Sequence, residues 1–279
     1  MSYQPGFPAH PPRIALGPHA VNGAKHPALS AVATGRPAGS PEPSSDESAG
    51  GRVALVSGAS GGLGLKIVRM LAANGMRVVL ASRSIAGGRA AVDLLGDLAD
   101  RVAVRQLDVN DADSITRLAA WLFRALGRCD VLVNNAAVLL DEDERASTVD
   151  PQLVRRTVET NLVGAWQLTQ AVVPLMRIHH YGRIVNISSG LGSLASMRAD
   201  LPAYRVSKCA VNALTRVLAD ELAGSGILVN ACGPGPAGAE VDDGAIGPSA
   251  SPAVPVWLAS LPDDGPTGAF YGESEVIDW

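Results

Sequence analysis

The sequence predicts an α/β fold in which a doubly wound, parallel sheet of about seven strands is covered by helices on both faces. The first observation is a regular alternation. From Arg52 onward, short runs rich in β-branched residues are followed by segments whose apolar residues recur at helical spacing. The second is the run DVLVNN (residues 130–135), which is apolar enough for a strand buried on both faces. The third is size, since 279 residues, 47% of them apolar, suffice for one large domain with a substantial core.

Each predicted element has its own sequence signal. The predicted strands are the apolar or β-branched runs at 52–57, 76–82, 101–107, 130–135, 182–189 and 226–232. The predicted helices have apolar residues at helical spacing over 63–75, 86–95, 111–127, about 151–179 and 202–223. Gly75 ends the first helix, and Gly127 ends the third, which begins with acidic residues. Because ligands of such sheets bind beyond the carboxyl ends of the strands, we expect function in the loops that follow them.

Residues 1–50 differ in composition from the rest of the chain. They contain nine Pro and six Gly but few large apolar residues, which is typical of a disordered tail. They hold no apolar run long enough for a signal peptide or a membrane span. We therefore expect a single domain over residues 51–279 and no membrane partner.

Charge and cysteine usage exclude several classes of protein. The net charge of −4 gives no reason to expect nucleic acid as a partner. Cys129, Cys209 and Cys232 are an odd number at wide spacing, which indicates a reduced, cytoplasmic protein without a disulfide framework. The histidines match no common spacing of metal ligands, so we expect no metal site.

The loop after the first strand, SGASGGLG, is rich in glycine and leads into a helix. Such a loop lets the backbone approach a diphosphate, while the helix N-terminus offers free N–H groups to it. The alternative is an ordinary glycine-rich turn. The residues that we expect around the diphosphate are Gly58, Ser60, Gly61, Gly62, Leu63 and Gly64.

The loops after the second, third and fourth strands indicate which dinucleotide would bind and where its parts would lie. After the second strand, Ser82 and Arg83 stand where an NAD site usually places an acid, and a guanidinium favours the 2′-phosphate of NADP instead. Asp108 and Val109 follow the third strand, where an adenine edge would lie. The small residues after the fourth strand would let a flat ligand pass over the sheet, although ordinary turn chemistry explains them equally. They are Asn135, Ala136 and Ala137.

The last helix pairs a phenol with an ammonium. Tyr204 and Lys208 are four residues apart near its start and therefore share one face. Ser189, fifteen residues before Tyr204, ends the fifth strand, so all three come to the edge of the sheet that carries the glycine loop. The alternative is a chance pair of half-buried side chains whose polar tips reach water.

Taken in order, these segments resemble the short-chain dehydrogenase/reductase family. The resemblance covers about residues 52–279 and rests on the motifs SGASGGLG, NNAA, ETNLVG, NISS, YRVSK and NACGPG. The C-terminal run LPDDGPTGAFYGESEVIDW looks most like the carbonyl-reductase-like branch. The resemblance implies a Rossmann fold, a nicotinamide cofactor and hydride transfer to or from a carbonyl or alcohol carbon. It also implies a homodimer or homotetramer.

The resemblance assigns roles to individual residues of this chain. It makes Tyr204 the acid/base, and Lys208 the residue that binds the nicotinamide ribose and lowers the tyrosine pKa. Ser189 would hold the substrate oxygen, and Asn161 would anchor a water in the proton relay. The cofactor contacts would continue through Pro234 and Gly235.

The loop after the sixth strand departs from the pattern of the branch. Pro236 replaces an aromatic residue, and Ala239 replaces a threonine that would meet the nicotinamide amide. The Gly-, Pro- and Ala-rich composition of this region predicts a mobile lid over about residues 236–255.

Three functions remain open from the sequence. The leading interpretation is an NADP(H)-dependent carbonyl reductase or alcohol dehydrogenase for a small, mainly apolar substrate facing Leu191, Leu194 and Met197. The second is a tailoring enzyme of a biosynthetic pathway with a different net reaction, and the third is a non-catalytic sensor of NADP(H). The run DEDER (residues 141–145) is expected to be a solvated loop rather than part of the substrate site.

Overall fold

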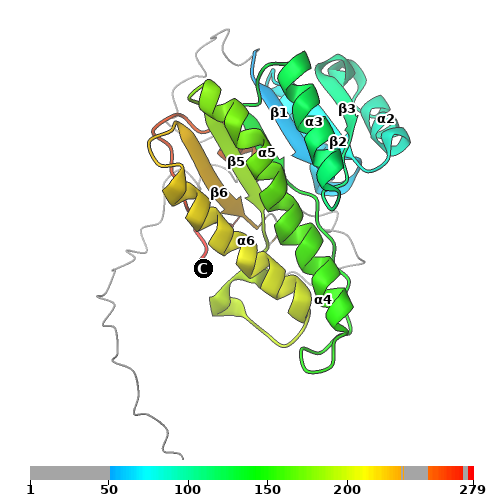
Figure 1. The fold of residues 1–279 in the computed structure, drawn as a ribbon, viewed down its shortest axis with the longest axis vertical. Helices are drawn as coiled ribbons and strands as arrows, with labels where there is room; N and C mark the ends of the chain where they lie inside the picture. The colour runs from blue at the N-terminus through cyan, green and yellow to red at the C-terminus, as the bar shows by residue number, and fades with distance from the viewer. Residues whose placement is uncertain (1–50, 234, 236–250, 273–275) are drawn as a thin grey trace, which may run out of the picture.

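Seven parallel strands form one sheet in the order β3-β2-β1-β4-β5-β6-β7 within the part of the chain that the structure describes (Figure 1). The computed structural model describes residues 51–233, 235, 251–272 and 276–279. The strands confirm the predicted ones and add a short seventh. They are β1 Val53–Ser57, β2 Arg77–Ser82, β3 Val102–Gln106, β4 Val131–Asn134, β5 Gly182–Ile187, β6 Ile227–Cys232 and β7 Phe270–Tyr271.

Helices cover both faces of the sheet, as predicted. Figure 1 shows α3, α5 and α6 over the face turned to the viewer, where their apolar side chains form one core with the sheet. Side chains of α1, α2 and α7 build a second core with the opposite face. The helices are α1 Gly62–Ala73, α2 Ile85–Asp93, α3 Ala112–Ala125, α4 Pro151–Val158, α5 Gly164–Ile178, α6 Pro202–Glu221 and α7 Ala253–Ala259.

The order of the strands determines where a ligand can bind. The chain runs from β1 outward through β2 to β3 and then returns to β4 on the other side of β1. The crossovers that leave β1 and β4 therefore go to opposite sides, which opens a crevice beyond the carboxyl ends of these two strands. The glycine loop and the segment NNAA both begin at this crevice.

The structure corrects two predicted boundaries. The helix expected over about 151–179 is interrupted by a π-helical turn, Glu159–Val163, between α4 and α5. The lid expected over about 236–255 ends too late, because Val254 and Pro255 are buried in α7 against the sheet. Residues 236–250 of that lid, the expected tail 1–50 and Pro234 lie outside the described residues.

A buried carboxylate joins β1 to the start of β4. Asp130 is fully buried, and its Oδ2 accepts the backbone N–H of Val53 at 2.7 Å. Both of its oxygens also accept hydrogen bonds from the Arg128 guanidinium, each at 2.8 Å. Because this contact lies at the amino end of the strands, it fixes the pairing of β1 with β4 without touching the crevice.

We predict that Asp130→Ala destabilises the protein by about 2–4 kcal/mol, because it leaves a buried N–H and a half-buried guanidinium without an acceptor. The free energy of unfolding from urea denaturation measures this loss. Glu221→Gln is the matched control, since its ion pair with Arg177 spans 3.6 Å between two exposed side chains. The control should change stability by less than about 0.5 kcal/mol. Equal losses in the two variants would contradict the assigned role of Asp130.

Candidate active site

A hydrogen-bonded bridge joins the loops that follow β1 and β4. The Ser57 hydroxyl accepts the backbone N–H groups of Asn135 and Ala136, each at 3.0 Å. In return, Asn135 Nδ2 donates to the carbonyl oxygens of Ser57 at 2.9 Å and Gly58 at 3.0 Å. The glycine loop and the segment NNAA are therefore held against each other at the crevice.

Two glycines of the predicted diphosphate loop are required by this contact. Gly58 has a φ of +62°, and a Cβ there would lie 2.8 Å from Cα of Ala136. A Cβ on Gly64 would lie 2.6 Å from Asn135 Nδ2 and 2.8 Å from the carbonyl oxygen of Gly58. The close approach of two loops thus explains both glycines without any ligand.

The remaining residues of the loop leave room for an anion. A Cβ built on Gly61 or Gly62 would meet no atom within 4 Å. Gly61 precedes α1, and no side chain caps this helix N-terminus among the described residues. Free backbone N–H groups therefore face open space beside the exposed Ser60, which fits a diphosphate. Leu63 can contribute only its backbone, since its side chain is buried in the core.

The end of β2 carries no carboxylate. Ser82 is buried, and its hydroxyl accepts the N–H of Ser84 at 3.3 Å. Ser84 in turn caps α2 by accepting the N–H of Gly87 at 3.1 Å. Arg83 between them is exposed and makes no hydrogen bond or ion pair with any described residue. Its guanidinium is therefore available to a phosphate.

Asp108 and Val109 form the wall of the crevice after β3. Asp108 Oδ1 accepts the N–H of Asn110 at 3.0 Å, which makes a turn of its own backbone. Val109 is buried against Gly164, where an added Cβ would lie 2.8 Å from Cβ of Val109. Asp108 and Val109 therefore lie after β3, where an adenine edge was expected, and one carboxylate oxygen of Asp108 already accepts a hydrogen bond within its own turn.

A chain of buried polar side chains ties α6 to the sheet. Asn134 Nδ2 donates to Asn186 Oδ1 at 2.8 Å, between β4 and β5. Asn186 Nδ2 then donates to the Thr215 hydroxyl on α6 at 2.9 Å. Because each buried polar group needs its partner, this chain fixes how α6 lies across the strands.

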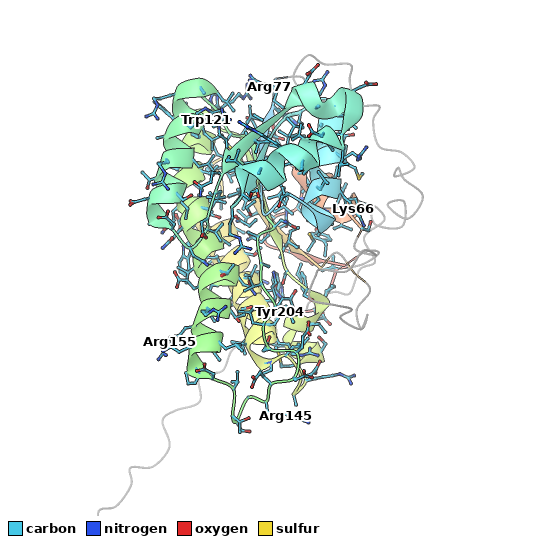
Figure 2. The ribbon with its side chains drawn as sticks, turned by 90° about the vertical axis from the view of Figure 1, so that its right-hand side faces the viewer. Lys66, Arg77, Trp121, Arg145, Arg155 and Tyr204 are labelled. Carbon is cyan, nitrogen blue, oxygen red and sulfur yellow. The ribbon has the colours of Figure 1, made fainter. Side chains whose placement is uncertain are left out.

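Ser189, Tyr204 and Lys208 converge at the start of α6, as predicted. The Ser189 hydroxyl lies close enough to the phenol of Tyr204, which is 6% exposed, to favour its ionised form. Lys208 Nζ lies 5.5 Å from the centroid of the Tyr204 ring and donates to the carbonyl oxygen of Ile187 at 2.8 Å. Figure 2 shows Tyr204 toward the end of the molecule that also carries Arg145 and Arg155.

Burial controls the charge of both groups. It raises the pKa of Tyr204 to about 12, although the hydrogen bond from Ser189 favours the phenolate and opposes it. Burial also lowers the pKa of Lys208 to about 8, since the ammonium loses its hydration. The net direction for the pKa of Tyr204 is upward, because desolvation of the phenolate outweighs the opposing effect of Ser189. The lowering of this pKa by Lys208, which the resemblance implied, stays a prediction.

Asn161 lies at the centre of the π-helical turn and is buried. Its Oδ1 accepts the N–H of Val138 at 2.7 Å, and its Nδ2 donates to the Val138 carbonyl at 2.9 Å and the Ser207 hydroxyl at 3.0 Å. The amide thus anchors the segment after β4 to α6. Both N–H groups of the amide are already used, whereas Oδ1 accepts one hydrogen bond and can accept a second from a relay water.

The sequence missed the role of Arg205, which follows Tyr204. Its guanidinium is buried and donates to both oxygens of Asp200, at 2.9 and 2.8 Å. It also donates to the carbonyl oxygens of Leu191 at 3.2 Å and Ser196 at 3.3 Å. One side chain therefore holds the loop between Ser189 and Tyr204 at three points. Its position next to Tyr204 suggested that Arg205 lies near the site, but the sequence does not show which groups its guanidinium binds.

Asp141 is the second residue that sequence reasoning missed. The expectation that residues 141–145 form a solvated loop is wrong for Asp141, which is fully buried, although Asp143 and Arg145 are exposed. Asp141 Oδ2 accepts the backbone N–H groups of Ala203 at 2.6 Å and Tyr204 at 3.1 Å. This carboxylate therefore reaches the first turn of α6.

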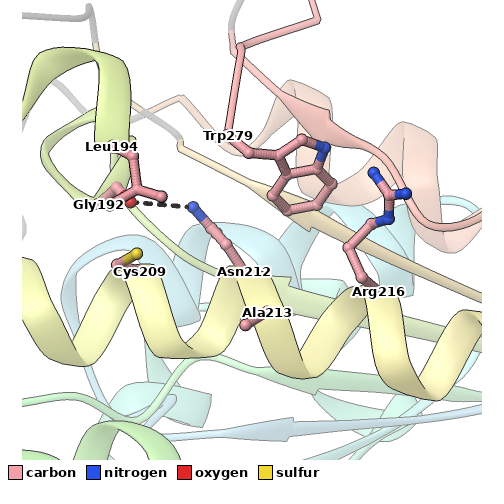
Figure 3. Close-up of a pocket in the computed structure, with 7 residues that line it drawn as sticks. All are labelled: Gly192, Leu194, Cys209, Asn212, Ala213, Arg216 and Trp279. Carbon is pink, nitrogen blue, oxygen red and sulfur yellow. Dashed lines mark hydrogen bonds between the residues drawn. The ribbon is translucent and has the colours of Figure 1, made fainter. Parts of the chain in front are cut away.

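One of the predicted substrate-facing residues lines a pocket beside α6. Leu194 lines a pocket of about 130 Å³ on the outer side of α6, together with Asn212 and Trp279 (Figure 3). None of Ser189, Tyr204 and Lys208 lines this pocket. Leu194 belongs to a short 3₁₀ turn, Leu194–Ser196, and its side chain is exposed, so the role of this residue toward a substrate stays a prediction.

The β6 end of the site is only partly described. Gly233 packs closely on the residues after β5, since an added Cβ would lie 2.8 Å from the N atom of Gly190. Gly235 is half-buried, with open space around its Cα.

The described residues contain no cluster of potential metal ligands. They also include no helix long and apolar enough to cross a membrane.

Comparison with known proteins agrees with this arrangement. The family model of the short chain dehydrogenases matches residues 52–245. Carbonyl reductase (NADPH) 1 of Sus scrofa is 33% identical over 82% of this chain and 94% of its own length. For (−)-isopiperitenone reductase of Mentha piperita, the identity is 29% and the coverage 81% and 98%. The crystal structure of a metagenomic short-chain oxidoreductase in complex with NADP superposes with a TM-score of 0.68, at 33% identity over 78% of this chain and 94% of that one.

We predict that Gly64→Ala destabilises the protein by about 1–3 kcal/mol, because the new Cβ overpacks the bridge around Asn135. Thermal unfolding measures the loss. Gly61→Ala is the control in the same loop, since its φ of −173° suits any residue and its Cβ meets open space. If Gly61→Ala lowered the melting temperature as much as Gly64→Ala, the bridge would not be the reason for the glycine.

Proposed function

Since this chain belongs to the short-chain dehydrogenase/reductase family, we propose that it is an NADP(H)-dependent oxidoreductase acting on the carbonyl or alcohol carbon of a small, mainly apolar substrate. The observation that carries the proposal is the convergence of the Ser189 hydroxyl, the buried Tyr204 phenol and Lys208, whose Nζ lies 5.5 Å from the centroid of the Tyr204 ring. The printed name of the Sus scrofa relative, a carbonyl reductase that uses NADPH, supports the same reaction.

The two hydroxyls suit a carbonyl oxygen. Both can donate to one oxygen, and together they would hold the carbonyl and stabilise the negative charge that develops on it. When bound, the nicotinamide supplies or accepts the hydride. In reduction, Tyr204 gives its proton to the oxygen as the carbon gains the hydride; in oxidation, the phenolate takes that proton back.

The protonation of Tyr204 favours reduction at neutral pH. With its pKa raised to about 12, the phenol is protonated and is a proton donor. Carbonyl reduction requires this form, whereas alcohol oxidation requires the phenolate.

The cofactor assignment rests on the loops after β1 and β2. The N-terminus of α1 offers N–H groups to a diphosphate beside Gly61 and Gly62, where there is room for it. Ser82 occupies the place of a ribose-binding acid, and Arg83 is exposed next to it. A guanidinium without a carboxylate beside it favours a phosphorylated ribose, so we propose NADP(H) rather than NAD(H).

We predict that Tyr204→Phe lowers the rate of carbonyl reduction by about 10²–10⁴-fold, because it removes the positioned acid. NADPH binding and the melting temperature should stay near those of the wild type, since one hydroxyl is lost and almost no volume. NADPH consumption with a panel of ketones and aldehydes measures the rate.

The rate of alcohol oxidation should rise about tenfold per pH unit below the phenol pKa in the wild type, because the phenolate fraction grows in that proportion.

The matched control for this variant is Tyr181→Phe. The Tyr181 hydroxyl is buried without a hydrogen-bond partner among the described residues, near the amino end of β5. This variant should turn over at the wild-type rate. Normal turnover by Tyr204→Phe would instead show that another group donates the proton or that the chain does not perform this chemistry.

We predict that Arg83→Ala weakens NADPH binding by about ten- to a hundredfold and leaves NADH binding unchanged, because a charge-assisted contact to phosphate is lost. Fluorescence titration of each cofactor measures both affinities. Arg89→Ala, a change of an exposed arginine on α2, is the control and should leave both affinities unchanged. Equal losses for the two cofactors, or a wild-type preference for NADH, would contradict the assignment.

A further inference from the structure

A fully buried carboxylate reaches Tyr204 from a distant part of the chain. Asp141 lies in the segment after β4, 62 and 63 residues before the two residues whose N–H groups it accepts. Those donors are the backbone N–H groups of Ala203 and of Tyr204 itself. Its other oxygen, Oδ1, is buried and has no hydrogen-bond partner among the described residues.

Helix α6 needs this acceptor. No side chain of its own start caps it, because Leu201 precedes the helix in the left-handed region with a φ of +51° and Pro202 follows. The first N–H groups of any helix lack partners within the helix and must find them elsewhere. Asp141 supplies that partner, and its negative charge suits the positive end of the helix dipole.

The charge of Asp141 is not balanced by a neighbouring cation. It forms no ion pair with any described residue, since the salt bridges of this region use other carboxylates. A buried charge without a counterion acts over a longer range than an exposed one, because water does not screen it. The phenol of Tyr204 is one group that responds to this charge, because a nearby negative charge opposes its ionisation.

Resting on the proposed function, we infer that Asp141 is a positioning residue: it fixes the first turn of α6, and with it the phenol of Tyr204, and its negative charge adds to the effect of burial by opposing ionisation of that phenol. The carboxylate therefore serves carbonyl reduction twice, through geometry and through charge, without touching the substrate.

Other groups also face the phenol, and each acts in a known direction. Ser189 donates a hydrogen bond that favours the phenolate. Lys208 lies across the ring on α6, faces Cys232 of β6, and its pKa is lowered to about 8 by burial. The guanidinium of Arg205 is paired with Asp200 and so contributes little net charge. Asp141 is thus the negative group that opposes ionisation of Tyr204.

Asp141→Asn separates charge from geometry. The amide oxygen can still accept both N–H groups, whereas the negative charge is gone. Without that charge the phenolate costs less, so the pKa of Tyr204 should fall by about 0.5–1 unit. The chain has four tyrosines, so NMR of protein labelled with ¹³C at tyrosine Cζ can follow each phenol as pH rises. Tyr204→Phe identifies the signal of Tyr204 by its disappearance.

Asp143→Asn is the matched control, because Asp143 is an exposed carboxylate in the same segment. It should leave the titration of Tyr204 unchanged. If Asp141→Asn does not fold, Asp141→Ser supplies a second neutral acceptor and is titrated in its place. A Tyr204 titration identical to that of the wild type in the folded neutral variant would overturn the proposal.

The rate of carbonyl reduction tests the positioning role of Asp141. Asp141→Ala removes the acceptor, so the first turn of α6 loosens and kcat for carbonyl reduction should fall by about tenfold or more, with NADPH affinity retained. Asp141→Asn should recover most of that kcat, and its rate of alcohol oxidation should rise relative to the wild type at the same pH. Wild-type kcat in Asp141→Ala, or no recovery in Asp141→Asn, would overturn the positioning role.

The two readouts keep this inference distinct from the proposed function. The NMR titration needs no turnover and reports on Asp141 and Tyr204 alone. A shifted titration in a protein that reduces no carbonyl would support the effect of Asp141 and reject the proposed reaction. An unshifted titration in a protein that reduces carbonyls would reject the role of Asp141 and leave the reaction standing.

Discussion

The site depends on the close approach of the loops after β1 and β4. Parallel pairing of these strands, with Val56 opposite Val133, brings their carboxyl ends level. The Ser57 hydroxyl and the Asn135 amide then join the two loops, and glycine at positions 58 and 64 is what allows them to meet. This contact leaves the N-terminus of α1 uncapped and facing open space, so the binding properties of the crevice follow from how two strands are packed.

Desolvation sets the chemistry at the start of α6. A buried phenol resists losing its proton and a buried ammonium resists keeping it, so Tyr204 and Lys208 shift in opposite directions. The phenol is left as an acid at neutral pH, which suits reduction of a carbonyl. Lys208 donates one hydrogen bond to the carbonyl oxygen of Ile187, which holds its ammonium beside the Tyr204 ring.

Two buried charged side chains, one on each side of Tyr204, give the site its shape. Arg205 holds the loop that follows Ser189, and Asp141 holds the first turn of α6. Buried charges are costly unless they are paired or hydrogen-bonded; Arg205 is paired with Asp200, whereas Asp141 binds two backbone N–H groups through Oδ2 and leaves Oδ1 without a partner among the described residues. Their burial therefore links the stability of the loops to the position of the catalytic candidates.

The sequence by itself determined the order of strands and helices and the glycine loop, because these depend on periodicity and local turn chemistry. The set Asn161, Ser189, Tyr204 and Lys208 came from the order of its motifs, through the family resemblance, and stays a prediction. It could not determine that the Asn161 amide binds the backbone of Val138, that Leu194 lines a pocket together with Trp279, or that burial raises the pKa of Tyr204. It also assigned Asp141 to solvent, since a run of charged residues is usually exposed. Only the tertiary structure decides these points, because burial, hydrogen-bond partners and pKa values arise from contacts between residues that are distant in the chain.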